Sequence, residues 1–183
     1  MKTIKKGIGN NVIAAVRTRE ELLSAAASDV RIVFHLSPNI FTLEEDIKIL
    51  HDKEKLLFLH LDLAEGIGRD KSGIEYIKKL GVDGIISTRT SIIKYAAELE
   101  LFTVQRFFIV DSQSIYTTIE TLKSSKAQMI EVMPGMSKTV NKLKDLVKVP
   151  IIAGGLIETA EEKSEILKSG ADAVSTGKSL LWY

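Results

Sequence analysis

The stretch "PIIAGGLIETAEE", residues 150–162, contains one copy of the unit from which the whole chain is built. Its first half is a short apolar run that ends in two adjacent glycines, Gly154 and Gly155. Its second half predicts the start of a helix, because Thr159 and Glu162 have the spacing of a capping box, in which each side chain accepts from the other's backbone N–H. A buried strand that passes directly into a capped helix is one strand–helix unit of an α/β fold.

The same alternation continues along the rest of the sequence. The apolar runs are nearly continuous in Val, Ile, Leu and Phe, as expected for strands that are covered on both faces. Several intervening segments open with Ser or Thr followed three residues later by Glu, which predicts helix starts at Thr18, Thr42, Ser72 and Thr159. The predicted strands are residues 11–16, 31–36, 55–63, 83–88, 104–111, 129–134, 150–155 and 173–177.

Strict alternation of strands and helices predicts a parallel sheet with right-handed crossovers. Eight units favour a closed (β/α)8 barrel over an open doubly wound sheet, although 183 residues require short loops. "KKLGVDGIIST" (78–88) resembles "LKSGADAVST" (167–176). Either a duplicated half-barrel or the common use of Gly and Asp in short loops explains this similarity. Because no linker composition interrupts the sequence, we expect residues 1–183 to form one compact single-domain TIM-barrel-like α/β fold.

The composition excludes several classes of protein. The chain is 45% hydrophobic and 27% charged, with a net charge of +1, so any basic surface must be local. The absence of cysteine excludes disulfides, thiolate metal sites and a cysteine nucleophile, and fits a reducing compartment. No apolar stretch reaches transmembrane length, and the apolar run near the N-terminus is too interrupted for a signal peptide. We therefore expect a cytoplasmic protein with no membrane partner.

A phosphate site is predicted from the glycines. In barrels of this kind the functional residues lie at the carboxyl ends of the strands, and the loops after strands 7 and 8 often bind a phosphate through backbone N–H groups. Here Gly154 and Gly155 follow the seventh predicted strand, and Thr176, Gly177 and Lys178 follow the eighth. The alternative is that these glycines only end strands at tight turns.

Other polar residues are expected at the same end of the barrel. Asp62 and Glu131 could accept hydrogen bonds from a small polyol, or could form internal salt bridges with Arg17, Arg89 and Lys178. His35 and His60 are predicted to be hydrogen-bonded barrel residues. Since no metal-ligand spacing is present, we predict no metal site.

Catalytic residues are hard to identify. A Schiff-base aldolase needs a lysine that projects from a strand into the mouth, and Lys55 and Lys178 lie at the wrong positions. A sensor pocket is therefore favoured, with no catalytic residue. Two alternatives remain: a lyase, isomerase or transferase acting on a small phosphorylated substrate, and a ligand-binding protein with no nucleic-acid role.

A lysine-rich flank is predicted on the fifth and sixth helices. Such runs are usually solvated helix faces, and the sequence has little aromatic interleaving and no known RNA-binding motif. The lysines are Lys123, Lys126, Lys138, Lys142, Lys144 and Lys148.

The sequence also resembles a known family. The segments "FHLSPNIF", "LFLHLDLAEGIGRDKSGIEYIKKLGVDGIISTR", "RFFIVDSQSI", "EVMPG" and "PIIAGGLIETAEE", in this order, are similar to the glycerol-3-phosphate-responsive antiterminators that regulate glycerol uptake operons. The resemblance spans essentially the whole chain, which looks like a full-length member. It implies a (β/α)-barrel, no cofactor, glycerol 3-phosphate as effector, and binding to the leader mRNA of glycerol-metabolism genes, which prevents termination and stabilises the transcript.

Candidate contacts follow from this resemblance and from the charges. Ligand-binding candidates are Gly154, Gly155, Thr176, Gly177 and Lys178 for the phosphate, and Asp62, Arg89 and Glu131 for the glycerol part. RNA-binding candidates, inferred from charge alone, are Lys138, Lys142 and Lys144. The apolar end "LLWY" could cover the barrel or a neighbouring subunit, so a homodimer is a further expectation.

Overall fold

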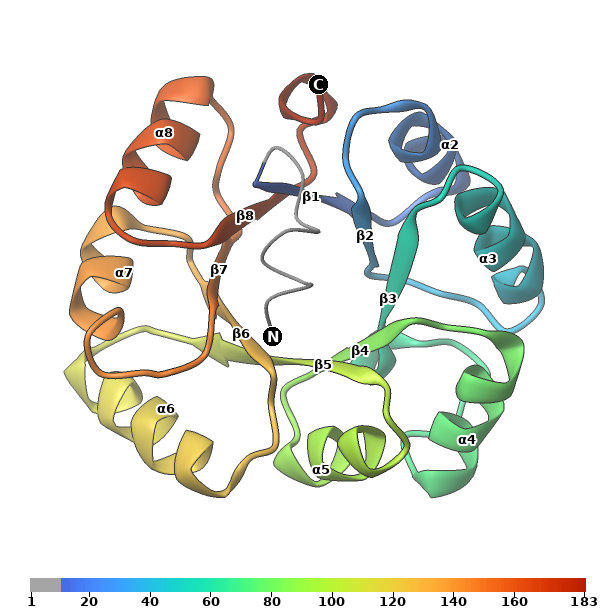
Figure 1. Ribbon diagram of the computed structural model, residues 1–183, viewed down its shortest axis with the longest axis horizontal. Helices are drawn as coiled ribbons and strands as arrows, with labels where there is room; N and C mark the ends of the chain where they lie inside the picture. The colour runs from blue at the N-terminus through green and yellow to red at the C-terminus, as the bar shows by residue number, and fades with distance from the viewer. Residues whose placement is uncertain (1–10) are drawn as a thin grey trace.

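A computed structural model describes residues 11–183, which form a closed barrel of eight parallel strands surrounded by helices (Figure 1). The strands pair in chain order, and β1 pairs with both β2 and β8, which closes the sheet and confirms the predicted barrel. The single-domain prediction for residues 1–183 includes residues 1–10, which lie outside the described part. The strands are β1 (Val12–Val16), β2 (Ile32–His35), β3 (Leu56–His60), β4 (Gly84–Ser87), β5 (Phe102–Phe108), β6 (Met129–Met133), β7 (Ile151–Gly154) and β8 (Ala173–Thr176).

A helix follows each strand and packs on the outside of the barrel, as Figure 1 shows. Each predicted apolar run overlaps one strand, and most strands are shorter than their runs, whereas β5 begins at Phe102, two residues before its predicted run. The helices are α2 (Arg19–Ala27), α3 (Leu43–His51), the 3-10 turn η1 (Leu61–Leu63), α4 (Lys71–Leu80), α5 (Thr90–Glu98), α6 (Ser112–Ser124), α7 (Ser137–Leu143), α8 (Ala160–Lys168) and the 3-10 turn η2 (Ser179–Leu181). Among the described helices, none is long and apolar enough to cross a membrane.

Two of the four predicted capping boxes form. The hydroxyls of Thr18 and Thr159 each accept a hydrogen bond from the backbone N–H of the glutamate three residues later. The carboxylate of that glutamate accepts from the backbone N–H of the threonine. Thr42 precedes α3, but its hydroxyl donates to Asp46 instead. The prediction at Ser72 is wrong, because the N-cap of α4 is Asp70, two residues earlier, which accepts from the Gly73 N–H.

The inside of the barrel is filled by side chains. Phe58 lies between Phe34 and Phe102, with ring centroids 5.7 and 6.0 Å away, and the three rings come from β2, β3 and β5. Phe34 and Phe58 are fully buried. Tightly packed rings exclude water from the middle of the barrel and leave only its mouth, at the carboxyl ends of the strands, for a ligand.

The C-terminal segment closes one side of the barrel. Trp182 is completely buried, and its indole N–H donates to the Thr176 carbonyl oxygen over 2.9 Å. Its own carbonyl accepts from the Asp29 N–H at the end of α2. Leu180 and Tyr183 remain exposed. The end of the chain therefore covers its own barrel in part, and the homodimer stays a prediction.

We predict that Phe58→Ala lowers the free energy of unfolding by about 3–5 kcal/mol, because it leaves a cavity between two rings. Urea unfolding followed by circular dichroism measures this loss. Phe41→Ala is the matched control, since Phe41 is 93% exposed and its removal should change stability by less than about 0.5 kcal/mol. Equal losses in the two variants would contradict a stabilising role for the ring stack.

Candidate functional site

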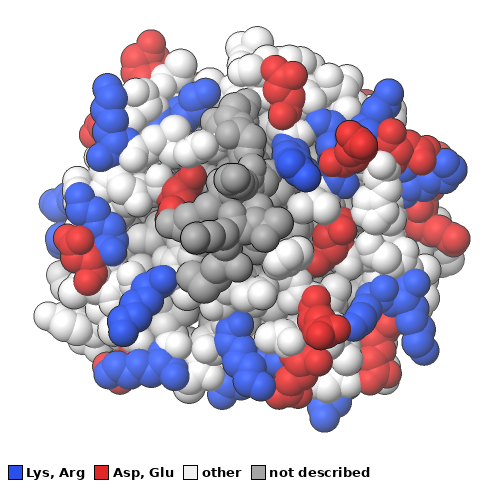
Figure 2. Space-filling view, viewed as in Figure 1, with Lys and Arg blue, Asp and Glu red and all other residues white. Residues whose placement is uncertain are grey.

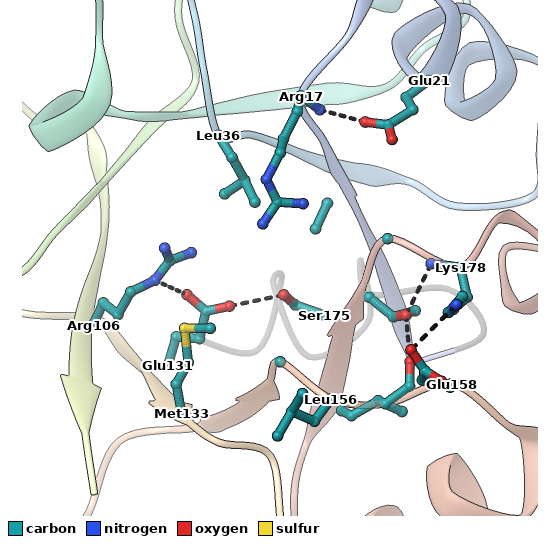
Figure 3. Close-up of a pocket in the computed structure, with 15 residues that line it drawn as sticks. Arg17, Glu21, Leu36, Arg106, Glu131, Met133, Leu156, Glu158, Ser175 and Lys178 are labelled. Atoms are coloured by element: carbon teal, nitrogen blue, oxygen red, sulfur yellow. Dashed lines mark hydrogen bonds and ion pairs between the residues drawn. The ribbon is translucent and has the colours of Figure 1, made fainter.

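A cavity of about 300 Å³ opens at the mouth of the barrel, between the ends of β1, β6, β7 and β8 (Figure 3). Its volume suits a small molecule. Five predicted ligand residues line it, namely Gly155, Thr176, Gly177, Lys178 and Glu131. The other lining residues are Ala15, Arg17, Glu21, Leu36, Arg106, Met133, Leu156, Ile157, Glu158 and Ser175.

The two adjacent glycines are favoured for different physical reasons. A Cβ on Gly154 would lie 2.4 Å from Oε1 of Glu131, so glycine is required there to make room for a buried carboxylate. Gly155 has a φ of 77°, in the left-handed region that favours glycine, and it borders the cavity. The next residue, Leu156, also has a positive φ of 58° and is 80% exposed. The chain therefore turns sharply at the edge of the cavity in a conformation that L-residues rarely adopt.

Thr176 joins the two glycine-containing loops. Its hydroxyl donates to the carbonyl of Ile157 over 2.8 Å and accepts from the Lys178 N–H over 3.0 Å. This hydroxyl is therefore engaged within the protein, and Thr176 shapes the cavity rather than offering a free donor. Nζ of Lys178 lies 3.2 Å from Oε1 of Glu158, and both side chains are more than half exposed.

Glu131 lies at the floor of the cavity and is 1% exposed. Its Oε2 accepts from Nε of Arg106 over 2.6 Å, and its Oε1 accepts from the Ser175 hydroxyl over 2.7 Å. Arg106 and Glu131 are opposite each other in the register of β5 and β6, which places both side chains inside the barrel. A charge in this position must be paired. The internal salt bridge considered for Glu131 is thus present, although its partner is Arg106.

Arg17 contributes a cation to the cavity lining. Figure 3 shows its guanidinium reaching into the cavity from the end of β1, and it forms no ion pair with any residue in 11–183. The Glu21 carboxylate accepts from the Arg17 backbone N–H and belongs to the capping box of α2. The lining has as many carboxylates (Glu21, Glu131 and Glu158) as cations, so its formal charge is balanced. Arg106 and Lys178 each face a carboxylate, whereas the Arg17 guanidinium forms no ion pair with a described residue.

Backbone donors are available beside these cations. Among the described residues, the N–H groups of Leu156 and Gly177 form no hydrogen bond with the protein. Both residues line the cavity, one on each glycine-containing loop. Free N–H groups next to a guanidinium and an ammonium are an arrangement that binds anions.

Asp62 and Arg89 lie elsewhere. Asp62, in η1, accepts from the Ser87 hydroxyl and from both the N–H and the hydroxyl of Thr88, over 2.7–2.9 Å, and Nε of Arg89 is 4.0 Å away. Burial raises the pKa of Asp62, but these hydrogen bonds outweigh it and hold the pKa below its usual value. The structure therefore places both residues between the ends of β3 and β4, apart from the residues that line the cavity.

The histidines show no sign of metal binding. His60 is 3% exposed at the end of β3, and burial, together with the charge of Arg106, lowers its pKa to about 4, so it is neutral at neutral pH. Nε2 of His35 lies 3.3 Å from a carboxylate oxygen of Asp46, in agreement with a hydrogen-bonded barrel residue. Within residues 11–183, no group of three or more His, Asp or Glu side chains could hold a metal ion.

No role was predicted for Arg106, which lies in the apolar run "VQRFFIVD". The available signal was strand alternation, which puts Arg106 on the same face as Val104. Since Val104 packs inside the barrel, that face is the interior one. In the same way, Glu131 lies two residues after the interior residue Met129 and therefore faces the interior. That the two charges pair with each other follows only from the register of β5 with β6.

Lys138, Lys142 and Lys144 are exposed on α7 and its C-cap. None of them forms an ion pair with a described residue, whereas Lys123 and Lys126 pair with Glu120 and Glu98. Figure 2 shows basic side chains along the edge of the molecule where α6 and α7 lie, and more closely mixed charges on the opposite side. The unpaired positive charge of the predicted flank is therefore concentrated on α7.

Comparisons with known proteins agree with this architecture. The structure of a glycerol uptake operon antiterminator regulatory protein from Listeria monocytogenes superposes with a TM-score of 0.88, at 30% identity over 94% of each chain. A glycerol uptake operon antiterminator-related protein from Thermotoga maritima gives 0.84 at 33% identity, over 94% of this chain and 97% of that one. The Escherichia coli (strain K12) protein YgcP is 34% identical over 94% of this chain and 92% of its own length.

More distant structures share the fold alone. An aldolase with a TM-score of 0.76 and an N-acetylmannosamine-6-phosphate 2-epimerase from Clostridium perfringens with 0.71 are each 12% identical to the chain. The family model for glycerol-3-phosphate responsive antiterminators, which are regulators and not enzymes, matches residues 12–182. This match covers nearly the whole sequence and confirms the resemblance. The chain therefore belongs to the glycerol-3-phosphate responsive antiterminator family.

Proposed function

We propose that the cavity binds glycerol 3-phosphate, and that the bound protein attaches to the leader mRNA of glycerol-metabolism genes, prevents termination and stabilises the transcript. The observation that carries the ligand part is the guanidinium of Arg17, which reaches into the cavity without a carboxylate partner among the described residues. An unpaired cation facing a cavity favours an anionic ligand.

The phosphate would lie between the two glycine-containing loops. The N–H groups of Leu156 and Gly177, the ammonium of Lys178 and the guanidinium of Arg17 surround this part of the cavity. A phosphate accepts hydrogen bonds from all of these groups, and guanidinium binds it in a bidentate manner. Among residues 11–183, the Lys178 ammonium pairs only with the exposed Glu158 carboxylate. A pair of this kind contributes about 0–1 kcal/mol, and a phosphate can displace it.

The glycerol part would point to the floor. Each oxygen of Glu131 already accepts one hydrogen bond and can accept a second. Arg106 uses Nε for Glu131 and keeps its remaining N–H donors. Acceptors and donors are thus present together, as a polyol requires, since a hydroxyl group is both donor and acceptor.

The RNA part rests on α7. Its lysines have no ion-pair partners among residues 11–183, so phosphates could replace water around them with release of counterions. Glycerol 3-phosphate can promote RNA binding only if it binds the RNA-competent conformation more tightly, and RNA must then increase the ligand affinity by the same factor. Isothermal titration with glycerol 3-phosphate, with and without leader RNA, tests both statements. Equal ligand affinity in the two titrations would contradict the linkage.

We expect Arg17→Gln to weaken the binding of glycerol 3-phosphate about tenfold or more, because a hydrogen bond to a charged group contributes about 1.5–3 kcal/mol. Isothermal titration measures the change. Arg31→Gln is the control, since Arg31 is exposed at the opposite end of the barrel, before β2. Unchanged affinity in Arg17→Gln would show that the phosphate does not bind in this part of the cavity.

Gly155→Asp should abolish ligand binding, because it puts a carboxylate where the phosphate would bind. Gly81→Asp is a matched control: Gly81 has a φ of 97°, so the backbone strain is similar, but it caps α4 away from the cavity. Ligand-dependent stabilisation in thermal unfolding reports binding in both variants. A normal ligand-induced shift in the melting temperature of Gly155→Asp would rule out the proposed site.

The triple variant Lys138→Glu, Lys142→Glu and Lys144→Glu should lose leader RNA at physiological salt while keeping its ligand affinity, because α7 lies outside the cavity. A gel shift with the leader transcript and saturating glycerol 3-phosphate measures the loss. The triple variant Arg31→Glu, Lys53→Glu and Lys79→Glu changes the net charge equally at three exposed positions of another flank. If both triple variants lost RNA to the same extent, net charge rather than α7 would explain binding.

A further inference from the structure

Four large apolar side chains are exposed on one side of the mouth. Phe108, Val110, Tyr116 and Met136, which we call the aromatic patch, are 57%, 83%, 65% and 52% exposed. Phe108 ends β5 and is paired in the register with Met133 of β6, three residues before Met136. Tyr116 lies one turn into α6, which begins just after β5. The patch thus occupies the mouth end of the α6–α7 side.

Unpaired cations border this patch. Lys138 lies in the first turn of α7, two residues after Met136, and Lys142 is one turn further along the helix. Residues 137–144 contain no acidic side chain. The nearest carboxylates are Asp145, which follows this segment directly, and Glu165 of α8, which accepts from the Ser137 hydroxyl over 2.6 Å. Neither forms an ion pair with Lys138 or Lys142. Exposed rings and unpaired lysines therefore lie next to each other.

This combination fits single-stranded RNA better than an apolar surface of a protein. Bases stack on aromatic rings, and the backbone phosphates beside them require cations. We propose that unpaired bases of the RNA stack on Phe108 and Tyr116 while Lys138 and Lys142 contact the neighbouring phosphates. This inference rests on the RNA binding proposed above and specifies its surface and the RNA chemistry that it recognises.

The same side of the mouth is connected to the ligand cavity. Met133 lines the cavity, and the N–H of Gly135 donates to the Gly155 carbonyl over 3.2 Å. Residues 133–137 therefore run from the cavity to Met136 and to the start of α7. A ligand that orders the Gly155 loop acts on the patch through one hydrogen bond. Phe41 is 93% exposed, but it lies on the loop between β2 and α3 and has no such connection to α7.

The test uses Phe108→Ala and Tyr116→Ala in the full chain. Fluorescence anisotropy of the labelled leader transcript, at saturating glycerol 3-phosphate, should show about tenfold weaker RNA binding for each variant. The slope of log affinity against log salt should stay unchanged, because the phosphate contacts remain. Phe108→Trp keeps a stacking surface and should bind RNA within about twofold of the wild type. Phe41→Ala is the matched control for removal of an exposed ring and should do the same.

Three outcomes would overturn the inference. If the wild type binds RNA and both alanine variants bind it equally well, the patch does not contact bases, although the proposed function stands. If the wild type binds no RNA in the presence of ligand, the proposed function itself fails. The third outcome is measured by sedimentation velocity. If the wild type is a dimer, and Phe108→Ala is a monomer with unchanged RNA affinity, the patch is a contact between two copies of the chain.

Discussion

Arg106 and Glu131 meet inside the barrel over 2.6 Å, and much of the mouth is arranged around this pair. A buried carboxylate needs compensation for the water that it loses, and it receives it from a guanidinium and from the hydroxyl of Ser175. The carboxylate occupies the space where a side chain at 154 would lie, so β7 must end in glycine. The pair also neutralises two charges at the cavity floor, and Arg17 is left as the lining cation without an ion-pair partner among the described residues.

The interior of the barrel is apolar beside the ion pair, where Phe34, Phe58 and Phe102 stack on one another. His60 lies at the end of β3, where burial and the charge of Arg106 lower its pKa to about 4. A charged imidazole is therefore absent at neutral pH, and the polar floor next to it depends on Arg106 and Glu131.

The fold could be predicted from the sequence because it depends on local patterns. Apolar runs of strand length alternate with capped amphipathic segments, and Thr18 and Thr159 cap in the predicted way. The cavity depends on contacts between distant residues. Arg106 and Glu131 are 25 positions apart, and only the register of β5 with β6 brings them together.

Asp62 and Glu131 also show that the surroundings of a side chain could not be predicted from local sequence patterns. Both are carboxylates near strand ends, but one accepts hydrogen bonds from Ser87 and Thr88 and the other lies under the cavity. Alternation along one strand does not distinguish these cases, since the distinction depends on which neighbours surround each carboxylate. The aromatic patch was hidden for the same reason, because its rings and the α7 lysines are separated by more than twenty residues in the chain.

The Gly155 loop is the element that the proposed ligand and the proposed RNA surface have in common. Its conformation is strained at Leu156, its contact from Glu158 to Lys178 is exposed and weak, and its Gly155 carbonyl holds the N–H of Gly135. A phosphate that takes over Lys178 removes the Glu158 contact at little cost and places a new charge beside the loop. Differential affinity of this kind is what shifts a conformational equilibrium, since a ligand that binds two states equally shifts nothing. Because the next residues after Gly135 are Met136 and the first turn of α7, such a shift would reach the proposed RNA surface without passing through the barrel strands.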